Sequence, residues 1–415
     1  MLNGIGGIGP TVSEMFLSGN HKEIADLKIN PMDYSDSWKF QRDYAAVNLL
    51  RKYPGLKTGI NTRDVALGKF EETEERCASL NFKLARSYLL TESTREILWM
   101  ARKEIERILG KFSWDATEPF LSFGPGASIG IPRRKSHPYY KIGTKTPTAT
   151  GEALAVDTAF INSVPLWKKF RETNGIDPKV VAGSKIVTVP KDARSDRVIA
   201  IEPQLNMFFQ KGIGGYMRYR LKRAGCDLND QSINQRLAFA GSRNGSLATI
   251  DLSSASDSIS RGLVEMLLPE DWLVALKSVR CVYTSLTSAG DGASHPHFLS
   301  KFSSMGNGYT FELESLLFMA LAKACCRYYG AKDRVVSVYG DDIVISTGVA
   351  QQYIDLLAEV GFTTNVEKSY IAGAFRESCG KHFFSGRDVT PFYLKKEVND
   401  RESLLWLLNS IRRHA

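Results

Sequence analysis

The sequence predicts an α+β fold in which an antiparallel sheet is backed by helices. From residue 245 onward, signals for strands alternate with signals for amphipathic helices. The stretch VVSVYGDDIVIS at 335–346 predicts a hairpin, because β-branched residues flank a Gly-Asp turn on both sides. The apolar stretch ESLLFMALAKACCRYYG at 314–330 predicts a buried helix that ends at Gly330. These three observations favour a mixed fold of helices and antiparallel strands.

Helices are also expected earlier in the chain. Residues 71–109 predict two helices, and Ser93 with Glu96 forms a capping box for the second helix, which ends at Gly110. From about 121 to 190 the chain is rich in Gly, Pro, Thr and basic residues. That composition predicts loops and short strands.

The later elements follow one another closely. LATIDL at 247–252 predicts a short strand, and the SSASDSISRGL that follows it starts a helix. The period of GLVEMLLPEDWLVALKSV at 262–279 predicts a helix, and QYIDLLAEVGF at 352–362 predicts a further amphipathic helix. These helices supply the apolar faces that back the sheet.

Length and composition set bounds on the kind of protein. A chain of 415 residues is too long for one small core, so two or three subdomains are expected. The net charge of +9 and the pI near 9.1 suit a polyanionic partner without requiring one. The cysteines form no CxxC pair, which argues against a zinc site or a disulfide framework and favours a reducing, cytosolic setting. No apolar run approaches the roughly 20 residues that span a bilayer, and the first ten residues lack the pattern of a signal peptide.

Two adjacent carboxylates stand at the tip of the predicted hairpin. Gly340 and Asp341 fit a two-residue type II′ turn, which places Asp341 and Asp342 together. One interpretation is a plain surface hairpin whose acids face water. The apolar flanks argue against it, because a solvated hairpin alternates polar and apolar residues. Two fixed acids repel each other unless a cation lies between them.

A third carboxylate, Asp251, is expected at the end of the strand 247–252. Alone it could cap the following helix, a role for which the nearby serines compete. Together with Asp341 and Asp342 it gives three hard oxygen ligands of the kind that Mg²⁺ prefers. Two such ions roughly 4 Å apart activate a hydroxyl and neutralise a leaving pyrophosphate. That is the chemistry of nucleotidyl transfer.

Several longer motifs occur in a fixed order along the chain. They are SFGPGASIG at 122–130, KIVTVPKDARSDRVIAIEPQLNMFFQKGIGG at 185–215, DLSSASDSIS at 251–260, SSMGNGYTFELESLLF at 303–318, VYGDDIVIS at 338–346 and FRESCGKHFFSGRDVTPFYLKK at 375–396. In this order they resemble the RNA-dependent RNA polymerases of small positive-strand RNA bacteriophages, the Q-beta-type (levivirus) replicase catalytic subunits. The resemblance covers roughly residues 120–396.

The resemblance implies roles for the carboxylates and a lysine. Asp251, Asp341 and Asp342 are implied as catalytic metal ligands, with Asp341 contacting both ions and Asp342 helping. Mg²⁺ is the implied cofactor, and Mn²⁺ or Ca²⁺ can occupy the same site. Lys368 is implied as the general acid that protonates the departing pyrophosphate. A lone surface lysine is the alternative for Lys368.

A second group of residues is implied to bind the incoming nucleotide. Lys191, Arg194 and Arg197 supply the fixed cations that a triphosphate needs, with Glu202 orienting one of the arginines. Asp257, expected just inside the next helix, helps to recognise the ribose 2′-hydroxyl. The alternative for Asp257 is an exposed acid that faces the helix dipole.

The glycine-rich loop before the helix at 314–330 is implied to approach the RNA. The residues expected to contact template and product are Gly306, Gly308 and Thr310. Here the chain departs from the wider viral pattern SGxxxTxxxN, because Met305 replaces the serine and Glu314 replaces the asparagine. Asn307 is the candidate that substitutes as a nucleotide contact, and ribose selection is left open.

The resemblance also implies a right-hand polymerase with an antiparallel palm sheet backed by helices. The expected divisions are an N-terminal helical region bridging fingers and thumb at 1–89, fingers at 90–242, palm at 243–262 and 303–374, a fingers insertion at 263–302, and a palm–thumb hairpin with the start of a short or truncated thumb at 375–415.

The function implied is template-directed RNA synthesis from nucleoside triphosphates, replicating a phage RNA genome in the cytoplasm of an infected bacterium. The alternatives are a reverse transcriptase and a catalytically inactive RNA-binding replicase subunit. The expected partners are an RNA template and product and nucleoside triphosphates. By resemblance alone, host elongation factors Tu and Ts and a ribosomal RNA-binding protein are also expected, and no membrane is.

Overall fold

The computed structural model describes residues 2–287 and 294–414, and it confirms the predicted α+β fold class. Its central sheet has antiparallel strands in the order β5-β10-β9. The strands are β5 (Leu247–Ile250), β9 (Val336–Tyr339) and β10 (Asp342–Ser346). The middle strand is covered on both faces, because Ile343, Val344 and Ile345 are all buried. The predicted hairpin and its covered position are confirmed.

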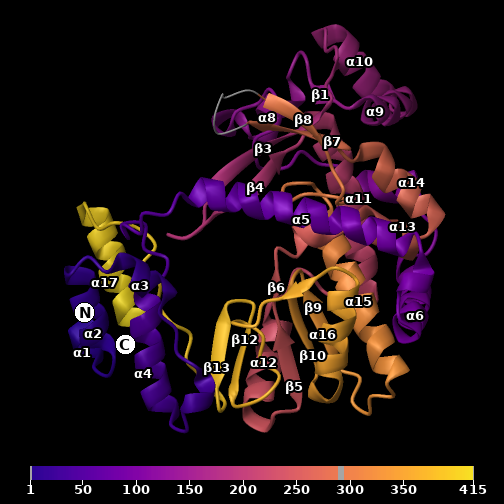
Figure 1. Ribbon diagram of the computed structural model, residues 1–415. Coiled ribbons are helices and arrows are strands. Elements are labelled where there is room, and N and C mark those ends of the chain that lie inside the picture. Colours follow the sequence, from indigo (N-terminus) through magenta and orange to yellow (C-terminus); the bar gives the residue numbers. More distant parts are fainter. Residues whose placement is uncertain (1, 288–293, 415) are drawn as a thin grey trace.

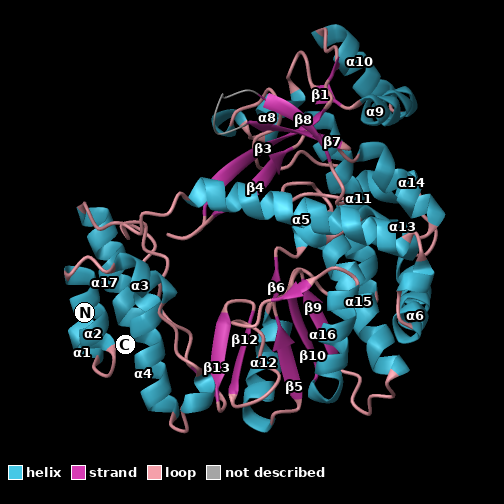
Figure 2. Cartoon of the chain, in the orientation of Figure 1, coloured by secondary structure: helices cyan, strands magenta, loops and turns pink. Residues whose placement is uncertain are grey.

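Helices back this sheet, as Figures 1 and 2 show. Apolar side chains of α6, α15 and α16 share one hydrophobic core with β9 and β10, and α12 packs against β5. The bounds are α6 (Glu92–Leu109), α12 (Ser232–Asn244), α15 (Thr310–Tyr328) and α16 (Ala350–Glu359). The predicted buried helix corresponds to α15, and Gly330 follows its end with a φ of +66°.

The long helix α5 (Thr62–Leu84) crosses the molecule above the central sheet (Figure 1). Its N-terminus is capped by Asn61, whose side chain accepts a hydrogen bond from the Asp64 N–H. It packs against β3 (Gly183–Pro190) and β4 (Asp196–Ile201), against α13 (Arg261–Leu267) and against the short 3₁₀ turn η5 (Ser256–Ser258). One helix near the start of the chain therefore contacts segments that follow much later.

A second sheet lies above α5, in the order β4-β3-β7-β8. Strands β3 and β4 pair antiparallel, β3 and β7 parallel, and β7 and β8 antiparallel. The bounds are β3 (Gly183–Pro190), β4 (Asp196–Ile201), β7 (Tyr283–Thr287) and β8 (Ser294–Phe298). Around it lie α7 (Trp114–Thr117), α8 (Pro138–Ile142), α9 (Gly151–Ser163), α10 (Pro165–Asn174), α11 (Gln204–Arg223), α13 (Arg261–Leu267), α14 (Glu270–Val279), β1 (Thr148–Ala149) and β2 (Lys179–Val180).

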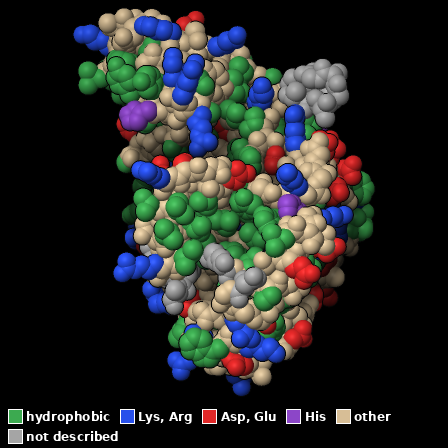
Figure 3. Space-filling model, turned by 90° about the vertical axis from the view of Figure 1, so that its left-hand side faces the viewer, with side chains coloured by type: hydrophobic (Ala, Val, Ile, Leu, Met, Phe, Trp, Pro, Cys, Tyr) green, Lys and Arg blue, Asp and Glu red, His purple; other side chains and the backbone are tan. Residues whose placement is uncertain are grey.

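The two ends of the chain meet on the other side of the molecule (Figure 1). The elements there are α1 (Leu2–Ile5), α2 (Gly9–Leu17), α3 (His21–Asp26), α4 (Ser37–Leu49) and α17 (Arg401–His414). The Leu394 N–H donates to the Leu49 carbonyl at 2.8 Å. Hydrophobic side chains gather on the outer face here, as Figure 3 shows, and Leu17 and Leu405 are among the exposed ones.

A three-stranded antiparallel sheet connects this side to the centre. It consists of β12 (Phe375–Ser378), β13 (Lys381–Phe384) and β14 (Arg387–Asp388). Phe40 of α4 stacks on Phe384 and meets Phe375 edge to face, with ring centroids 4.6 and 5.3 Å away. This aromatic cluster fixes α4 to the sheet.

Three sequence predictions about the helices are wrong. Thr91, not Ser93, caps α6, because its hydroxyl accepts from the Thr94 N–H at 3.3 Å. The stretch 262–279 is not one helix, since Pro269 cannot continue the ladder and separates α13 from α14. The region 121–190 contains α9 and α10 as well as loops and strands.

No helix in the described part of the chain is long and apolar enough to span a lipid bilayer.

Candidate active site

Three carboxylates converge at one end of the central sheet. In the pairing of β5 with β10, Ile250 lies opposite Ile343, so the next position in the register sets Asp251 beside Asp342. Asp341 occupies the turn between β9 and β10. All three acids line one cavity, and their role as metal ligands stays a prediction.

The hairpin turn holds Asp341 by close packing. Tyr339 pairs with Asp342, which leaves Gly340 and Asp341 as a two-residue turn, and Gly340 has a φ of +62°. The Gly340 N–H donates to the Ser315 hydroxyl of α15 at 3.0 Å. A Cβ on Gly340 would lie 2.6 Å from the Phe311 ring. Both the backbone angle and the space therefore require glycine at this position.

Asp251 is held by polar groups of the loop that follows strand β11 (Thr363–Thr364). Its Oδ2 accepts a hydrogen bond from Asn365 Nδ2 at 2.7 Å, and Lys368 Nζ lies 3.9 Å from its Oδ1. Burial raises the pKa of Asp251 to about 7, and the charge of Lys368 opposes this shift. The negative charges of Asp341 and Asp342 raise the pKa further. Asp251 does not cap a helix, so that alternative is wrong.

Asp342 is held by the turn between β12 and β13. Its Oδ1 accepts from the Cys379 N–H at 3.1 Å and from the Ser378 hydroxyl at 3.3 Å. Burial raises the pKa of Asp342 to about 6, the Cys379 hydrogen bond lowers it, and the charge of Asp341 raises it. Cys379 adopts a φ of +48°, a strained angle for a non-glycine residue, to present this N–H. One oxygen of Asp342 is thus already occupied by the protein.

The carboxylates do not form a closed ligand group. Within residues 2–287 and 294–414, no three Asp, Glu, His or Cys side chains lie close enough together to hold a metal ion. The physical reason is that Asp251 turns one oxygen to Asn365 and Asp342 turns one oxygen to Cys379, while the like charges repel one another. The binding of Mg²⁺ by Asp251, Asp341 and Asp342 therefore stays a prediction.

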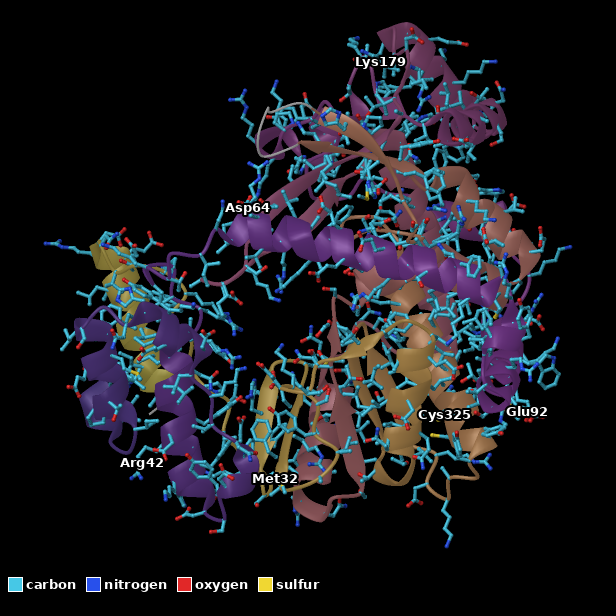
Figure 4. All side chains as sticks on the ribbon, in the orientation of Figure 1. Met32, Arg42, Asp64, Glu92, Lys179 and Cys325 are labelled. Atoms are coloured by element: carbon cyan, nitrogen blue, oxygen red, sulfur yellow. The ribbon has the colours of Figure 1, made fainter. Side chains whose placement is uncertain are left out.

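The cavity on which these acids open has a volume of about 2350 Å³. It lies between α5, the central sheet and the N-terminal helices, and side chains from all three project into it (Figure 4). Lys191 and Arg194 line it from the β3–β4 connection and Arg197 from β4, and Lys368 lines it beside Asp251. Burial lowers the pKa of Lys191. Further cations come from the two ends of the chain: Lys28, Arg51, Lys52, Lys57, Lys69, Arg76 and Lys395.

Asp257 also lines the cavity, but its local structure differs from the prediction. It lies in the 3₁₀ turn η5, and the helix that follows starts only at Arg261. Its Oδ1 accepts a hydrogen bond from Lys301 Nζ at 2.8 Å. The alternative of an exposed acid facing a helix dipole is wrong, because Asp257 is ion-paired.

The glycine-rich loop serves the protein's own packing. Gly306, with a φ of +114°, lies so close to β4 that a Cβ would be 2.2 Å from the Ala200 carbonyl oxygen. Gly308 packs in the same way against α11, and the Thr310 hydroxyl donates to the Ser304 carbonyl. The Asn307 side chain accepts from the Tyr309 N–H at 3.0 Å. None of these residues lines the cavity in the described structure.

Glu202 is likewise used elsewhere. It is buried, accepts a hydrogen bond from Gln210 at 3.0 Å, and lies 3.0 Å from the Cys281 sulfur. It therefore does not orient Arg194 or Arg197, and that prediction is wrong. Burial raises its pKa.

Sequence reasoning missed the residues that hold the acids in place. They are Asn365, Ser378, Cys379 and Lys301. Burial and the nearby charge of Asp341 raise the pKa of Glu314 well above its usual range. One signal was available, because Lys301 is a lone lysine between the apolar residues of FLSKF.

A sheet that presents clustered carboxylates to a cavity with basic walls is the class of site that the ordered motifs predicted. A family model described as RNA replicase, beta-chain, matches residues 11–415, so the chain belongs to that family. It is 40% identical over 388 residues to the RNA-directed RNA polymerase subunit beta of Qbeta virus strain MX1, covering 91% of this chain and 63% of that protein. The corresponding subunit of Enterobacteria phage SP is 40% identical over 385 residues, with coverages of 90% and 64%. The polymerase beta chain of Escherichia phage MS2 is 38% identical over 378 residues, with coverages of 89% and 67%. The chain thus spans less than two thirds of the length of the first two relatives.

Proposed function

We propose that this protein is an RNA-directed RNA polymerase that copies an RNA template from nucleoside triphosphates. The observation that carries the proposal is the convergence of Asp251 with Asp341 and Asp342 on a basic cavity. Membership of the RNA replicase beta-chain family supports it, since the relatives are named RNA-directed RNA polymerase.

The subdomains of a right-hand polymerase follow from the same proposal. The central sheet with α15 and α16 is the palm, at 243–262 and 303–374. The upper sheet and its helices are the fingers, at 90–242 with the insertion 263–302. Helix α5 lies within the bridging region at 1–89, and α17 lies within the thumb segment at 375–415.

The donor set suits a hard divalent cation, with Mg²⁺ as the proposed ion. Asp251 and Asp341 would hold it directly, while Asp342, with one oxygen already bonded to Cys379, would assist. The raised pKa of Asp251 and of Asp342 supports this fit, because clustered acids of this kind are stabilised by a cation. When bound, a pair of such ions supplies Lewis-acid stabilisation of the attacking hydroxyl and the departing pyrophosphate.

The chain's own residues then bind and orient the nucleotide. Lys191, Arg194 and Arg197 offer charge-assisted hydrogen bonds to the triphosphate from the wall formed by the β3–β4 connection and β4. A 3′-hydroxyl loses its proton to solvent as its oxygen bonds to the α-phosphorus, the bond from that phosphorus to the pyrophosphate oxygen breaks, and Lys368 donates a proton to the departing pyrophosphate. The charges of Asp251 and Glu377 help to raise the pKa of Lys368 although burial opposes them, so the lysine carries its proton at neutral pH. Asp257 accepts a hydrogen bond from the ribose 2′-hydroxyl.

The partners proposed are therefore RNA and nucleoside triphosphates. The host elongation factors and the ribosomal RNA-binding protein stay predictions from resemblance.

The test is a synthesis assay with purified protein, a single-stranded RNA template and Mg²⁺. Ribonucleotides are expected to give RNA product that EDTA abolishes. The variants D251N and D341N are expected to lower the rate by about 100- to 1000-fold, the scale for losing one electrostatic contact to the transition state. The matched control is D355N, which changes an exposed carboxylate on α16.

Three outcomes separate the candidate functions. RNA product that depends on Asp251 and Asp341 supports the polymerase. Product formed only from deoxynucleotides supports the reverse transcriptase. Retention of RNA on a filter without any synthesis supports the inactive binding subunit.

A further inference from the structure

A lysine is buried completely beside the cavity. Lys301 has no exposed side-chain surface, and its Nζ lies 2.8 Å from Asp257 Oδ1 and 3.5 Å from Glu74 Oε1. Its ammonium also lies 3.9 Å from the centre of the Phe70 ring. Burying a lysine is costly unless its charge is paired, so three favourable contacts on one ammonium indicate a defined role.

The lysine joins three separate parts of the chain. Phe70 and Glu74 belong to α5, Asp257 to the turn η5, and Lys301 to the segment after β8. Glu74 is itself buried, and its Oε2 accepts from the Ser300 N–H at 2.6 Å. The Glu74 carboxylate therefore fixes both the backbone before Lys301 and the ammonium at its tip.

The pair with Lys301 sets the orientation of Asp257. One oxygen of Asp257 accepts from Lys301, while the other receives no hydrogen bond from any described residue. The Asp257 side chain is 16% exposed and belongs to the cavity wall that also contains Asp251. The Oδ1 of Asn307, the candidate nucleotide contact of the glycine-rich loop, accepts from the Tyr309 N–H, and Asn307 does not line the described cavity. Lys301 is thus the described side chain that holds Asp257 at the cavity.

We propose that Lys301 is a positioning residue for ribose selection, and that Glu74 of α5 holds it in place. The Asp257 oxygen left free by Lys301 accepts the hydrogen bond of the nucleotide 2′-hydroxyl, which a deoxynucleotide lacks. Without the ammonium, Asp257 is free to change rotamer and its oxygen no longer lies in one place. The inference rests on the proposed polymerase function and assigns ribose selection in that site to a fixed ion pair.

The measurement is the ratio of kcat/KM for incorporation of ATP to that for 2′-deoxyATP. In K301M this ratio is expected to fall at least about tenfold, the scale of one hydrogen bond to a charged group. The loss is expected mainly in the KM for ATP, and K301R is expected to restore part of the ratio. The matched control is K277M, whose lysine pairs with Glu265 on the exposed surface of α13 and α14 and leaves the ratio unchanged.

A double-mutant cycle separates positioning from a structural role. If Lys301 acts through Asp257, then K301M added to D257N changes the ratio no further. If thermal unfolding shows that K301M is not folded, the E74Q variant is used in its place. In E74Q the side-chain amide oxygen still accepts from the Ser300 N–H, whereas the negative charge beside Lys301 is lost. E74Q is expected to lower the ratio of kcat/KM for ATP to that for 2′-deoxyATP by a smaller factor than K301M does.

Two results would overturn the inference, and they are distinguishable. A folded K301M or E74Q protein that incorporates ATP and 2′-deoxyATP with equally reduced efficiency assigns Lys301 a structural role only. A wild-type protein that makes no RNA from any template removes the proposed function and this inference together.

Discussion

The Gly340 position offers a direct test of how the hairpin presents Asp341. An alanine there must adopt the φ of +62° that the turn requires, and left-handed backbone costs a non-glycine residue about 1–2 kcal/mol. The new Cβ also lies 2.6 Å from a carbon of the Phe311 ring and 3.0 Å from Glu314 Oε1. Phe311 cannot easily retreat, because its ring packs edge to face on Tyr339 with centroids 5.1 Å apart.

A matched glycine isolates the two contributions. Gly330, after α15, has nearly the same φ of +66°, and a Cβ there meets no atom within 4 Å. G330A therefore costs the backbone term alone, about 1–2 kcal/mol of unfolding free energy. G340A adds an overpacking cost of about 1–3 kcal/mol. The difference between the two variants measures how firmly the turn is packed against α15.

The assay combines urea unfolding, followed by tryptophan fluorescence, with the RNA synthesis assay. G330A is expected to synthesise RNA at the wild-type rate. G340A is expected to lose about 100-fold in rate, the scale for displacing a catalytic group by about 1 Å. Equal destabilisation of the two variants, with full synthesis by G340A, would show that the turn neither packs tightly nor positions Asp341.

Two further predictions concern the sheet that contacts this hairpin. Burial lowers the pKa of His382, against the charge of Glu377, so folding favours the neutral ring. In the unfolded chain the His382 imidazole has a pKa of about 6.5, so below that pH the unfolded chain binds more protons than the folded protein. The free energy of unfolding therefore falls as the pH drops through this value, by at most about 1.4 kcal/mol per pH unit. Asp251 and Asp342, whose pKa values are raised, give wild type and H382Q the same opposite trend, so the His382 effect is the difference between the two proteins. The urea midpoint of the wild type is expected to fall relative to that of H382Q as the pH drops from 7.5 to 5. The second prediction is that R376M loses about 1–3 kcal/mol of unfolding free energy at pH 7, because buried Arg376 donates to the carbonyls of Leu247 at 2.6 Å and Gly373 at 2.9 Å. An unchanged urea midpoint in R376M would contradict the view that this side chain ties β12 to β5.

The parts of the fold that sequence predicted are those in which local chemistry determines local geometry. β-Branched residues on both sides of Gly340 specify a hairpin, and the apolar run at 316–322 specifies a buried helix. The acids could be grouped because strand pairing brings the ends of β5 and β10 together.

The errors arose where tertiary contacts override local signals. The glycine-rich loop is expected to approach RNA, which stays a prediction, and tertiary packing adds a use that the sequence did not indicate, because its glycines lie closely against β4 and α11 of the same chain. Glu202 was expected to orient Arg194 or Arg197, whereas it is buried and accepts a hydrogen bond from Gln210. Neither the direction of a side chain from a short strand nor the identity of a packing partner is encoded in a local pattern.

The hydrogen-bond partners of the acids also separate what a local sequence pattern predicts from what tertiary contacts determine. Asp342 receives the N–H of Cys379, Asp251 the amide of Asn365, and Asp257 the ammonium of Lys301. Each donor comes from a different segment, and each bond exists only because the sheets and α5 fix the distance. A carboxylate motif in the sequence therefore predicts which atoms carry the chemistry, whereas the orientation of those atoms is set by residues that have no motif of their own. In this protein the orienting groups reach back to α5, so the helix near the start of the chain is part of the same site as the acids of the central sheet.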